Sequence, residues 1–269
     1  MNQCARITLI LLFDLTFISG CAAPATPAPD FSRYFQERNV KGAFLLFDAD
    51  KAEFIRYCPD QRCEQRFIPA STFKLLNAQI ALETGVIADE NEIIPWDGVE
   101  RGIAAWNQDH NLRTAMQNSV VWFYQELAHR IDPERMQHYI DLVGYGNRDI
   151  SGPDPFWLEG NLRISQAEQI EFLRRLYEED LPFSQSTMQT VKDIILLEET
   201  PAYRLSGKTG WASSVDPDVG WFVGYVEKNS NVYYFATNID DEGSEESLGK
   251  ISREITEGIL AELGILPTP

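Results

Sequence analysis

A serine and a lysine three residues apart, Ser71 and Lys74, offer the clearest chemistry in this chain of 269 residues. They stand in the apolar run FIPASTFKLL at positions 67–76. Residues three apart on a helix have Cβ atoms only about 5–6 Å apart, and Pro69 favours a helix that starts here. Because a serine hydroxyl needs an adjacent base to act as a nucleophile at neutral pH, the pair predicts a nucleophile and its base.

The tetrapeptide alone is weak evidence, since Ser247-Leu-Gly-Lys250 has the same spacing. That second copy follows an acidic, loop-like stretch where no burial is expected. Ser71 is instead followed by apolar residues at helical spacing before Gly85, which predicts a buried helix ending at a glycine cap. A buried lysine loses hydration, which favours its neutral amine. Context therefore favours Ser71 and Lys74 as the reactive pair.

Three further motifs follow in order along the chain. Ser119-Val-Val121 lies on a second helical pattern, Tyr145-Gly-Asn147 opens a loop that continues to Trp157, and Lys208-Thr-Gly210 ends an apolar segment. Each motif has an ordinary alternative: Ser213-Ser-Val215 repeats the spacing of the first, and a lone Lys-Thr-Gly is common in turns. Their order behind Ser71 favours a catalytic interpretation.

The chain has only three histidines, at positions 110, 129 and 138. His129 and His138 sit on charged helical patterns, where a solvated role is the simpler interpretation, and His110 follows a Trp-Asn-x-Asp run that favours a structural one. A Ser-His-Asp triad is therefore disfavoured, and no spacing indicates a metal site. Lys74 is left as the base.

The elements that must position these residues follow from hydrophobic periodicity. Strands are predicted at 41–48, 52–57, 203–209, 219–227 and 232–238, helical patterns dominate from 71 to about 197, and an amphipathic helix is predicted at 246–263. Strands at both ends with helices between them predict an α+β fold, in which an antiparallel sheet flanked by terminal helices adjoins a helical subdomain. We expect the reactive residues between the two parts.

The ordered motifs resemble those of the penicillin-recognising serine enzymes and, within them, the class D or oxacillinase-type β-lactamases. The resemblance runs from about Phe44 to about Leu260 and includes the runs WNQDH at 106–110, FWLEG at 156–160 and GWFVG at 220–224. It implies the penicillin-recognising fold and hydrolysis of the β-lactam amide through an acyl-enzyme on Ser71.

The resemblance also implies that Lys74 reacts with CO2 from bicarbonate to form a carbamate, N6-carboxylysine, which serves as the general base without any bound cofactor. A neutral amine exists only in an apolar site, which Phe73, Val121, Trp157 and Leu158 would supply. The indole N–H of Trp157 offers the carbamate a donor, although a core tryptophan is the ordinary alternative.

Further roles come from the same family. Backbone N–H groups of Ser71 and Trp211 would form the oxyanion hole, and Ser119 would relay a proton to the departing lactam nitrogen. Lys208 and Thr209 would hold the substrate carboxylate, with Lys208 assisting the proton relay. Substrate-binding positions implied by the resemblance are Trp106, Val121, Thr209 and Gly210.

One departure concerns the arginine that the family carries on its last helix for the substrate carboxylate. Aligning Ile255 and Thr256 with the family puts Ser252 at that place, with Arg253 one residue late. Either the preceding loop shifts the register so that Arg253 serves, or Lys208 and Thr209 carry more of the binding.

Composition agrees with one secreted catalytic domain, residues 31–269. A chain with 44% hydrophobic residues can bury a substantial core. The net charge of −18 argues against nucleic acid or an anionic membrane surface as a partner, because both would repel it. The expected partner is a small β-lactam, and the oligomeric state stays open.

The N-terminus has Arg6, an apolar run at 7–18 and then Ile18-Ser-Gly-Cys21. Such a run is too short to span a bilayer and predicts a signal peptide, residues 1–20, directing the protein to the periplasm. Two interpretations stay open: a lipoprotein box with lipidation of Cys21 and anchoring to the outer membrane, or ordinary cleavage near Ala22 or Ala23. Residues 21–30, rich in Ala and Pro, would then be a short tether.

Cys58 and Cys63 flank turn-forming residues, so we expect them to face each other across a hairpin. A disulfide is predicted in an oxidising compartment, worth on the order of 2 kcal/mol for so small a loop.

Three rival functions keep the same fold. A β-lactam sensor domain would be acylated at Ser71 without turnover, but such sensors resemble a domain fused to a membrane-embedded protease, and the sequence contains no H-E-x-x-H motif. A peptidoglycan transpeptidase and a structural lipoprotein are the others. Turnover of a β-lactam distinguishes the enzyme from all three.

Overall fold

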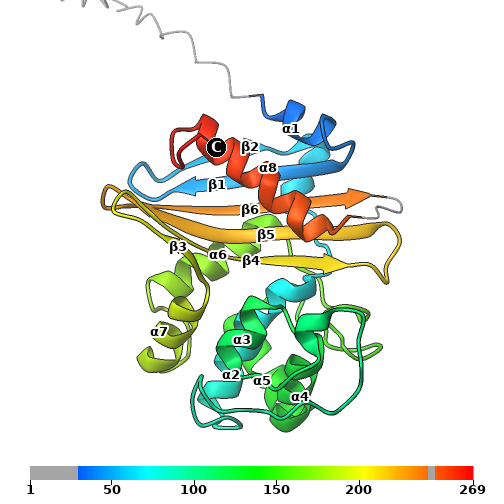
Figure 1. The fold of residues 1–269 in the computed structure, drawn as a ribbon. Coiled ribbons are helices and arrows are strands. Elements are labelled where there is room, and N and C mark those ends of the chain that lie inside the picture. Colours follow the sequence, from blue (N-terminus) through cyan, green and yellow to red (C-terminus); the bar gives the residue numbers. More distant parts are fainter. Residues whose placement is uncertain (1–29, 242–245, 269) are drawn as a thin grey trace, which may run out of the picture.

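A six-stranded antiparallel sheet forms the upper layer of the molecule in Figure 1. This computed structural model describes residues 30–241 and 246–268. The strands lie in the order β2-β1-β6-β5-β4-β3. Their bounds are β1 Lys41–Asp48, β2 Glu53–Tyr57, β3 Leu196–Glu199, β4 Arg204–Ala212, β5 Asp218–Lys228 and β6 Asn231–Asp241. The two ends of the chain thus meet in one sheet, because β1 pairs with β6 along its whole length.

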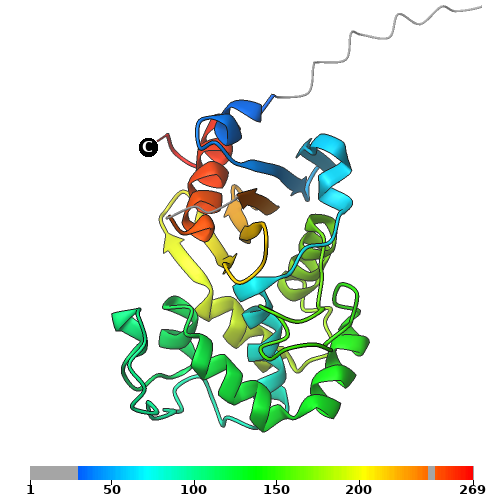
Figure 2. The ribbon, with the colours of Figure 1, turned by 90° about the vertical axis from the view of Figure 1, so that its right-hand side faces the viewer.

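The central strands β5 and β6 are buried along most of their length because helices cover both faces of the sheet. Helices α1 (Ser32–Gln36) and α8 (Leu248–Glu262) pack on one face, and α6 (Gln166–Tyr177) packs on the other, as Figure 2 shows with the sheet turned. The burial of apolar side chains on both faces explains why these strands read as near-continuous hydrophobic runs.

The helical part lies below the sheet in Figure 1 and is inserted between β2 and β3. Its α-helices besides α6 are α2 (Lys74–Glu83), α3 (Leu112–Gln117), α4 (Val121–Ile131), α5 (Pro133–Val143) and α7 (Gln185–Ile194). The 3₁₀ turns are η1 (Pro59–Glu64), η2 (Ala70–Phe73) and η3 (Ala104–Trp106). Helix α2 is buried along nearly its whole length at the centre of this part, because α4 and α7 both pack against it.

The predicted α+β class is confirmed, with each predicted strand within a few residues of an observed one. Strand β3 was not predicted: the helical pattern was extended to about 197, since no glycine or proline separates α7 from the strand. Ser119 was placed on a helix and instead lies in the turn between α3 and α4. In the two described ranges, no helix is long and apolar enough to cross a membrane.

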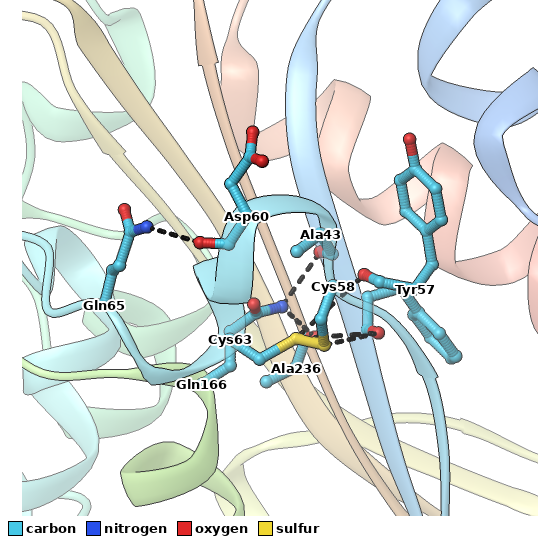
Figure 3. Close-up of a disulfide and its surroundings, with 9 residues drawn as sticks. Ala43, Tyr57, Cys58, Asp60, Cys63, Gln65, Gln166 and Ala236 are labelled. Carbon is cyan, nitrogen blue, oxygen red and sulfur yellow. Dashed lines mark hydrogen bonds between the residues drawn. A yellow bond between two sulfur atoms is a disulfide. The ribbon is translucent and has the colours of Figure 1, made fainter.

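Cys58 and Cys63 form the predicted disulfide, shown in Figure 3. The expected hairpin is wrong, because the six residues after Cys58 form η1 and no strand follows them. The bridge instead closes this turn against the end of β2. The predicted signal peptide, Cys21 and nearly all of the predicted tether lie outside the described residues.

Candidate active site

The nucleophile candidate sits in a 3₁₀ turn that leads directly into α2. Ser71 belongs to η2, and Lys74 is the first residue of the α-helix. The Nζ atom of Lys74 lies 2.5 Å from the Oγ atom of Ser71, as the spacing of three residues predicts. Gly85, with φ +66°, follows the end of α2 as the expected glycine cap.

Lys74 is fully buried, and its surroundings favour the uncharged amine. Burial, followed by the positive charge of Lys208, holds the pKa of Lys74 well below the usual range of a lysine. The ring of Tyr124 lies 5.5 Å from Nζ and forms part of the enclosing wall. A neutral amine beside a serine hydroxyl can accept its proton, which makes Ser71 a candidate nucleophile.

Ser119 approaches the same lysine from the turn before α4. Its Oγ lies 3.4 Å from Nζ of Lys74. Its φ of +53° is unusual for a residue with a side chain, and no glycine or proline in the sequence indicates it. The turn, rather than a helix face, therefore aims this hydroxyl at Lys74.

Trp157, in the loop after α5, packs against Phe73, the residue that precedes Lys74. It is fully buried and stacks on Phe73 with ring centroids 5.5 Å apart. Its indole Nε1–H is buried, and it has no hydrogen-bond partner among the described residues. Buried donors are normally satisfied, so an unpaired one at this place indicates room for an acceptor.

Strand β4 forms the sheet side of the site and carries Lys208, Thr209, Gly210 and Trp211. A Cβ on Gly210 would lie 3.3 Å from the backbone nitrogen of Ser71, so the strand passes close to the nucleophile turn. Lys208 is buried, and burial lowers its pKa to about 8. Its Nζ donates to the carbonyl of Thr209 at 3.0 Å.

A cleft of about 380 Å³ opens above these groups. It brings together seven of the site residues predicted from sequence: Ser71, Trp106, Ser119, Val121, Thr209, Gly210 and Trp211. Lys74, Trp157 and Lys208 lie buried beneath or beside it. The indole N–H of Trp106 donates to the carbonyl of Asn118 at 2.9 Å, which fixes that ring at the rim.

Arg253 is not brought into this cleft. Its Nε donates to Glu257 at 2.6 Å, and its guanidinium lies 5.8 Å from the ring centre of Phe222. It lines a separate cavity together with Lys208 and Thr209. Ser252, one residue earlier, is buried and donates to the carbonyl of Leu248 at 2.8 Å.

Histidines take no part in the cleft. His110 is buried between Thr114 and the carbonyl of Ala105, whereas His129 contacts Asp154 at the surface. Within 30–241 and 246–268, no group of three His, Cys, Asp or Glu residues is arranged to hold a metal ion.

Some cleft residues were not predicted from the sequence to belong to the site. Ile103 and Glu159 line the rim, and Ser247 and Gly249 line it from the start of α8. Ser247 and Gly249 are brought there by tight packing, because a Cβ on Gly249 would lie 3.0 Å from the carbonyl oxygen of Gly210. The second Ser-x-x-Lys spacing was the only sequence signal at this place.

Comparison with known proteins places the chain in one family. A model of the penicillin binding protein transpeptidase domain matches residues 42–261. Beta-lactamase OXA-48 of Klebsiella pneumoniae is 43% identical over 97% of this chain and 99% of its own. The class D β-lactamase YbXI from Nostoc superposes with a TM-score of 0.84, at 49% identity over 88% of this chain and 99% of that one.

A relative of another kind also matches. Regulatory protein BlaR1 of Bacillus licheniformis is 38% identical over 89% of this chain but only 39% of its own length. The family match and the coverage of whole β-lactamases show that the chain belongs to the transpeptidase-domain family and, within it, to the class D serine β-lactamases.

Proposed function

We propose that this protein hydrolyses the amide bond of β-lactams through an acyl-enzyme on Ser71. The observation that carries this function is the 2.5 Å contact between the Ser71 hydroxyl and the amine of a fully buried Lys74, at the base of an open cleft. The uncharged amine can take the hydroxyl proton as the oxygen attacks the lactam carbonyl.

The remaining steps follow from the groups around Ser71. As the carbon–nitrogen bond breaks, the lactam nitrogen needs a proton, which Ser119 can pass on because its hydroxyl lies 3.4 Å from Nζ of Lys74. The oxyanion would be held by the backbone N–H groups of Ser71 and Trp211. Their proposed pairing is supported by the close approach of β4 to the turn that carries Ser71.

The substrate carboxylate is assigned to Lys208 and Thr209. Thr209 lines the cleft, and the amine of the buried Lys208 lies 3.0 Å from the carbonyl oxygen of Thr209. The sequence left open whether Arg253 binds the carboxylate or whether Lys208 and Thr209 carry more of the binding. Arg253 forms an ion pair with Glu257 outside this cleft, which favours Lys208 and Thr209 on β4.

CO2 fits the residues around Lys74. Burial holds the pKa of Lys74 well below its usual range, which favours the uncharged amine that CO2 requires, and the unpaired indole N–H of Trp157 can donate to a new acceptor. We therefore propose that Lys74 is carboxylated when CO2 is available. On the modified side chain the carbamate oxygens would replace the amine as the base, first for the Ser71 proton and then for the water that releases the acyl group.

A persistent acyl state is the second candidate, favoured by the similarity to BlaR1. Benzylpenicillin mixed with the purified protein distinguishes the two functions. Intact mass followed over time, together with an absorbance assay of hydrolysis, should show an adduct that appears and disappears with turnover. A permanent adduct without hydrolysis would assign the protein to the sensors.

For the cell compartment we propose the periplasm, on the strength of the N-terminal leader pattern, with Cys21 as a candidate lipid anchor. Fractionation of cells that produce the full chain tests both. If Cys21 is lipidated, the mature protein should be found in the membrane fraction. The Cys21→Ser variant should then be found in the soluble fraction. Equal solubility of the two proteins would favour ordinary cleavage.

A further inference from the structure

The backbone directly before the nucleophile is strained. Ala70 has a φ of +49°, a region that residues with a side chain rarely adopt. Such a conformation costs free energy and persists only where neighbouring groups hold it in place. The residues that hold this turn therefore also set the position of the Ser71 hydroxyl and N–H.

One set of contacts holds the turn from the helical side. The N–H of Ala70 donates to the carbonyl of Trp157 at 2.9 Å. The hydroxyl of Thr72 donates to the carbonyl of Pro69 at 2.7 Å and accepts from the amide of Gln169 at 2.8 Å. These contacts hold the residues on both sides of Ser71 from the helical part. They do not connect the turn to the sheet.

A second set reaches the turn from the sheet. The indole N–H of Trp221 on β5 donates to the carbonyl of Ile68 at 2.8 Å. The edge of the Trp221 ring meets Phe67, with centroids 6.4 Å apart. The guanidinium of Arg62 lies 4.3 Å from the centre of the Phe67 ring, within the range of a cation–π contact.

Arg62 is largely buried for an arginine, with 11% of its side chain exposed. It lies 3.0 Å from a carboxylate oxygen of Asp240 and donates to the side-chain oxygen of Asn238 at 2.6 Å. The amide of Asn238 in turn contacts the carbonyl of Gly220, next to Trp221. Arg62 therefore contacts Phe67, which precedes Ile68, and is linked through Asn238 to the strand that carries Trp221.

The Cys58–Cys63 disulfide fixes the loop from which Arg62 projects. We infer that Arg62 is a positioning residue for Ser71, and that this disulfide keeps it in place. The inference rests on the proposed role of Ser71 as nucleophile. It assigns to the loop a role in the acylation step, beyond the stability that any small disulfide provides.

Rapid mixing with benzylpenicillin tests this inference, with the acylation rate constant and the burst amplitude measured separately. In Arg62→Met, acylation should slow by about 10- to 100-fold, the size expected when a reacting group is misplaced by a fraction of an ångström to an ångström. The burst amplitude should fall only to the value set by the ratio of the acylation and deacylation rate constants, since every folded molecule still reacts. Deacylation should change less, because Asn77 holds α2 independently by donating to the carbonyl of Tyr124 at 3.1 Å.

Two matched variants separate position from fold. Arg62→Lys keeps the charge near Asp240 and Phe67, so it should recover part of the acylation rate. Arg66→Gln removes an exposed arginine paired with Glu168, also next to Phe67, and should acylate like the wild type. A purely structural role of Arg62 would instead reduce the number of folded molecules and leave their acylation rate constant unchanged, which would overturn the inference.

Reduction of the disulfide provides a test that needs no variant. Reduced wild type should show the same slow acylation as Arg62→Met, and reduction should slow that variant little further, because both changes act through one path. Unchanged acylation after verified reduction would overturn the role of the disulfide, including in the case where Arg62→Met does not fold. Absence of both hydrolysis and an acyl adduct in untreated wild type would contradict the proposed function itself.

Discussion

The serines of two Ser-x-x-Lys tetrapeptides, Ser71 and Ser247, line one cleft, but only one of the tetrapeptides has a buried lysine. Lys74 is fully buried, with its amine 2.5 Å from Ser71. Lys250 has 63% of its side chain exposed and lies 2.5 Å from Glu246 and 3.6 Å from Glu254. The same spacing therefore gives a serine–lysine contact at one place and a surface ion pair at the other.

The two lysines also differ in the direction of their pKa shifts. Burial lowers the pKa of Lys74, whereas the hydrogen bond and the charge of Glu246 raise that of Lys250. An ammonium held by a carboxylate cannot accept a proton from a serine, while a desolvated amine can. Reactivity thus depends on the apolar surroundings of the motif and not on the tetrapeptide itself.

The strongest test of this difference between the two tetrapeptides is to replace Ser71 and Ser247, one at a time, by alanine. Ser71→Ala should lose at least about 10⁴-fold in hydrolysis and form no penicillin adduct, because the covalent route is removed. Ser247→Ala should still form an adduct of one acyl group, located on the peptide that contains Ser71. Intact mass and peptide mapping measure both. An adduct on Ser71→Ala would refute the nucleophile assignment.

The lysines give the next largest contrast. Lys74→Ala should lose about 10²- to 10⁴-fold in turnover, the usual contribution of a general base, with any acyl-enzyme that forms accumulating. Lys250→Gln should keep wild-type turnover, because its amine faces solvent and acidic side chains. Single-turnover kinetics separate acylation from deacylation. Brisk multiple turnover by Lys74→Ala would remove Lys74 from the mechanism.

Much of the serine–lysine side of the site could be predicted from sequence, because the signals there are local. Ser71 and Lys74 are three positions apart, a spacing that brings two side chains together on a helix. The apolar residues that follow predict that this helix is buried. The sheet was predictable for a similar reason, since β5 and β6 are hydrophobic over long runs.

Features set by tertiary packing were harder to predict. Ser119 adopts φ +53° without glycine, and β3 is a four-residue edge strand whose residues continue a helical pattern. The direction in which Arg253 points depends on which face of α8 packs against β5. A shift of one residue along the helix changes that face, and the guanidinium lies near Phe222 of β5. Arg62 gave no signal, because its partners Asn238 and Asp240 lie near the other end of the chain.

The surroundings of Lys74 can be tested by changing Trp157. Trp157→Phe removes the unpaired indole N–H while keeping an aromatic ring against Phe73. Activity should fall by about 10-fold or more, the usual size for losing a group that supports a reacting ligand. Because the loss is proposed to lie in the affinity of Lys74 for CO2, added bicarbonate should restore part of the activity by mass action.

Trp96→Phe serves as the control, since Trp96 donates to the carbonyl of Val99 in a loop that contributes no reactive group. Its activity should equal that of the wild type at every bicarbonate concentration. Carbon-13 NMR with labelled bicarbonate should show a carbamate in the wild type and a weaker one in Trp157→Phe. If neither protein responds to bicarbonate and no carbamate signal appears, Lys74 acts as a free amine.

The smallest expected effect is a pH dependence that distinguishes Lys208 from Lys250. Burial lowers the pKa of Lys208 to about 8, so its positive charge is present below that pH and is lost as the pH rises through it. In the proposed function this charge holds the substrate carboxylate. The KM for benzylpenicillin should therefore rise by about 10-fold between about pH 7 and pH 9, following the fraction of Lys208 that is protonated.

Lys208→Arg identifies the group responsible, because a guanidinium stays charged throughout this range. Its KM should be nearly constant from neutral to alkaline pH, even where its turnover is lower than that of the wild type. Lys250→Gln should keep the wild-type rise, since its exposed side chain lies among acidic groups outside the lysine pocket. Steady-state kinetics of the three proteins at constant ionic strength measure this directly. A rise with the same midpoint in Lys208→Arg would assign the titration to another group and remove the charge of Lys208 from substrate binding.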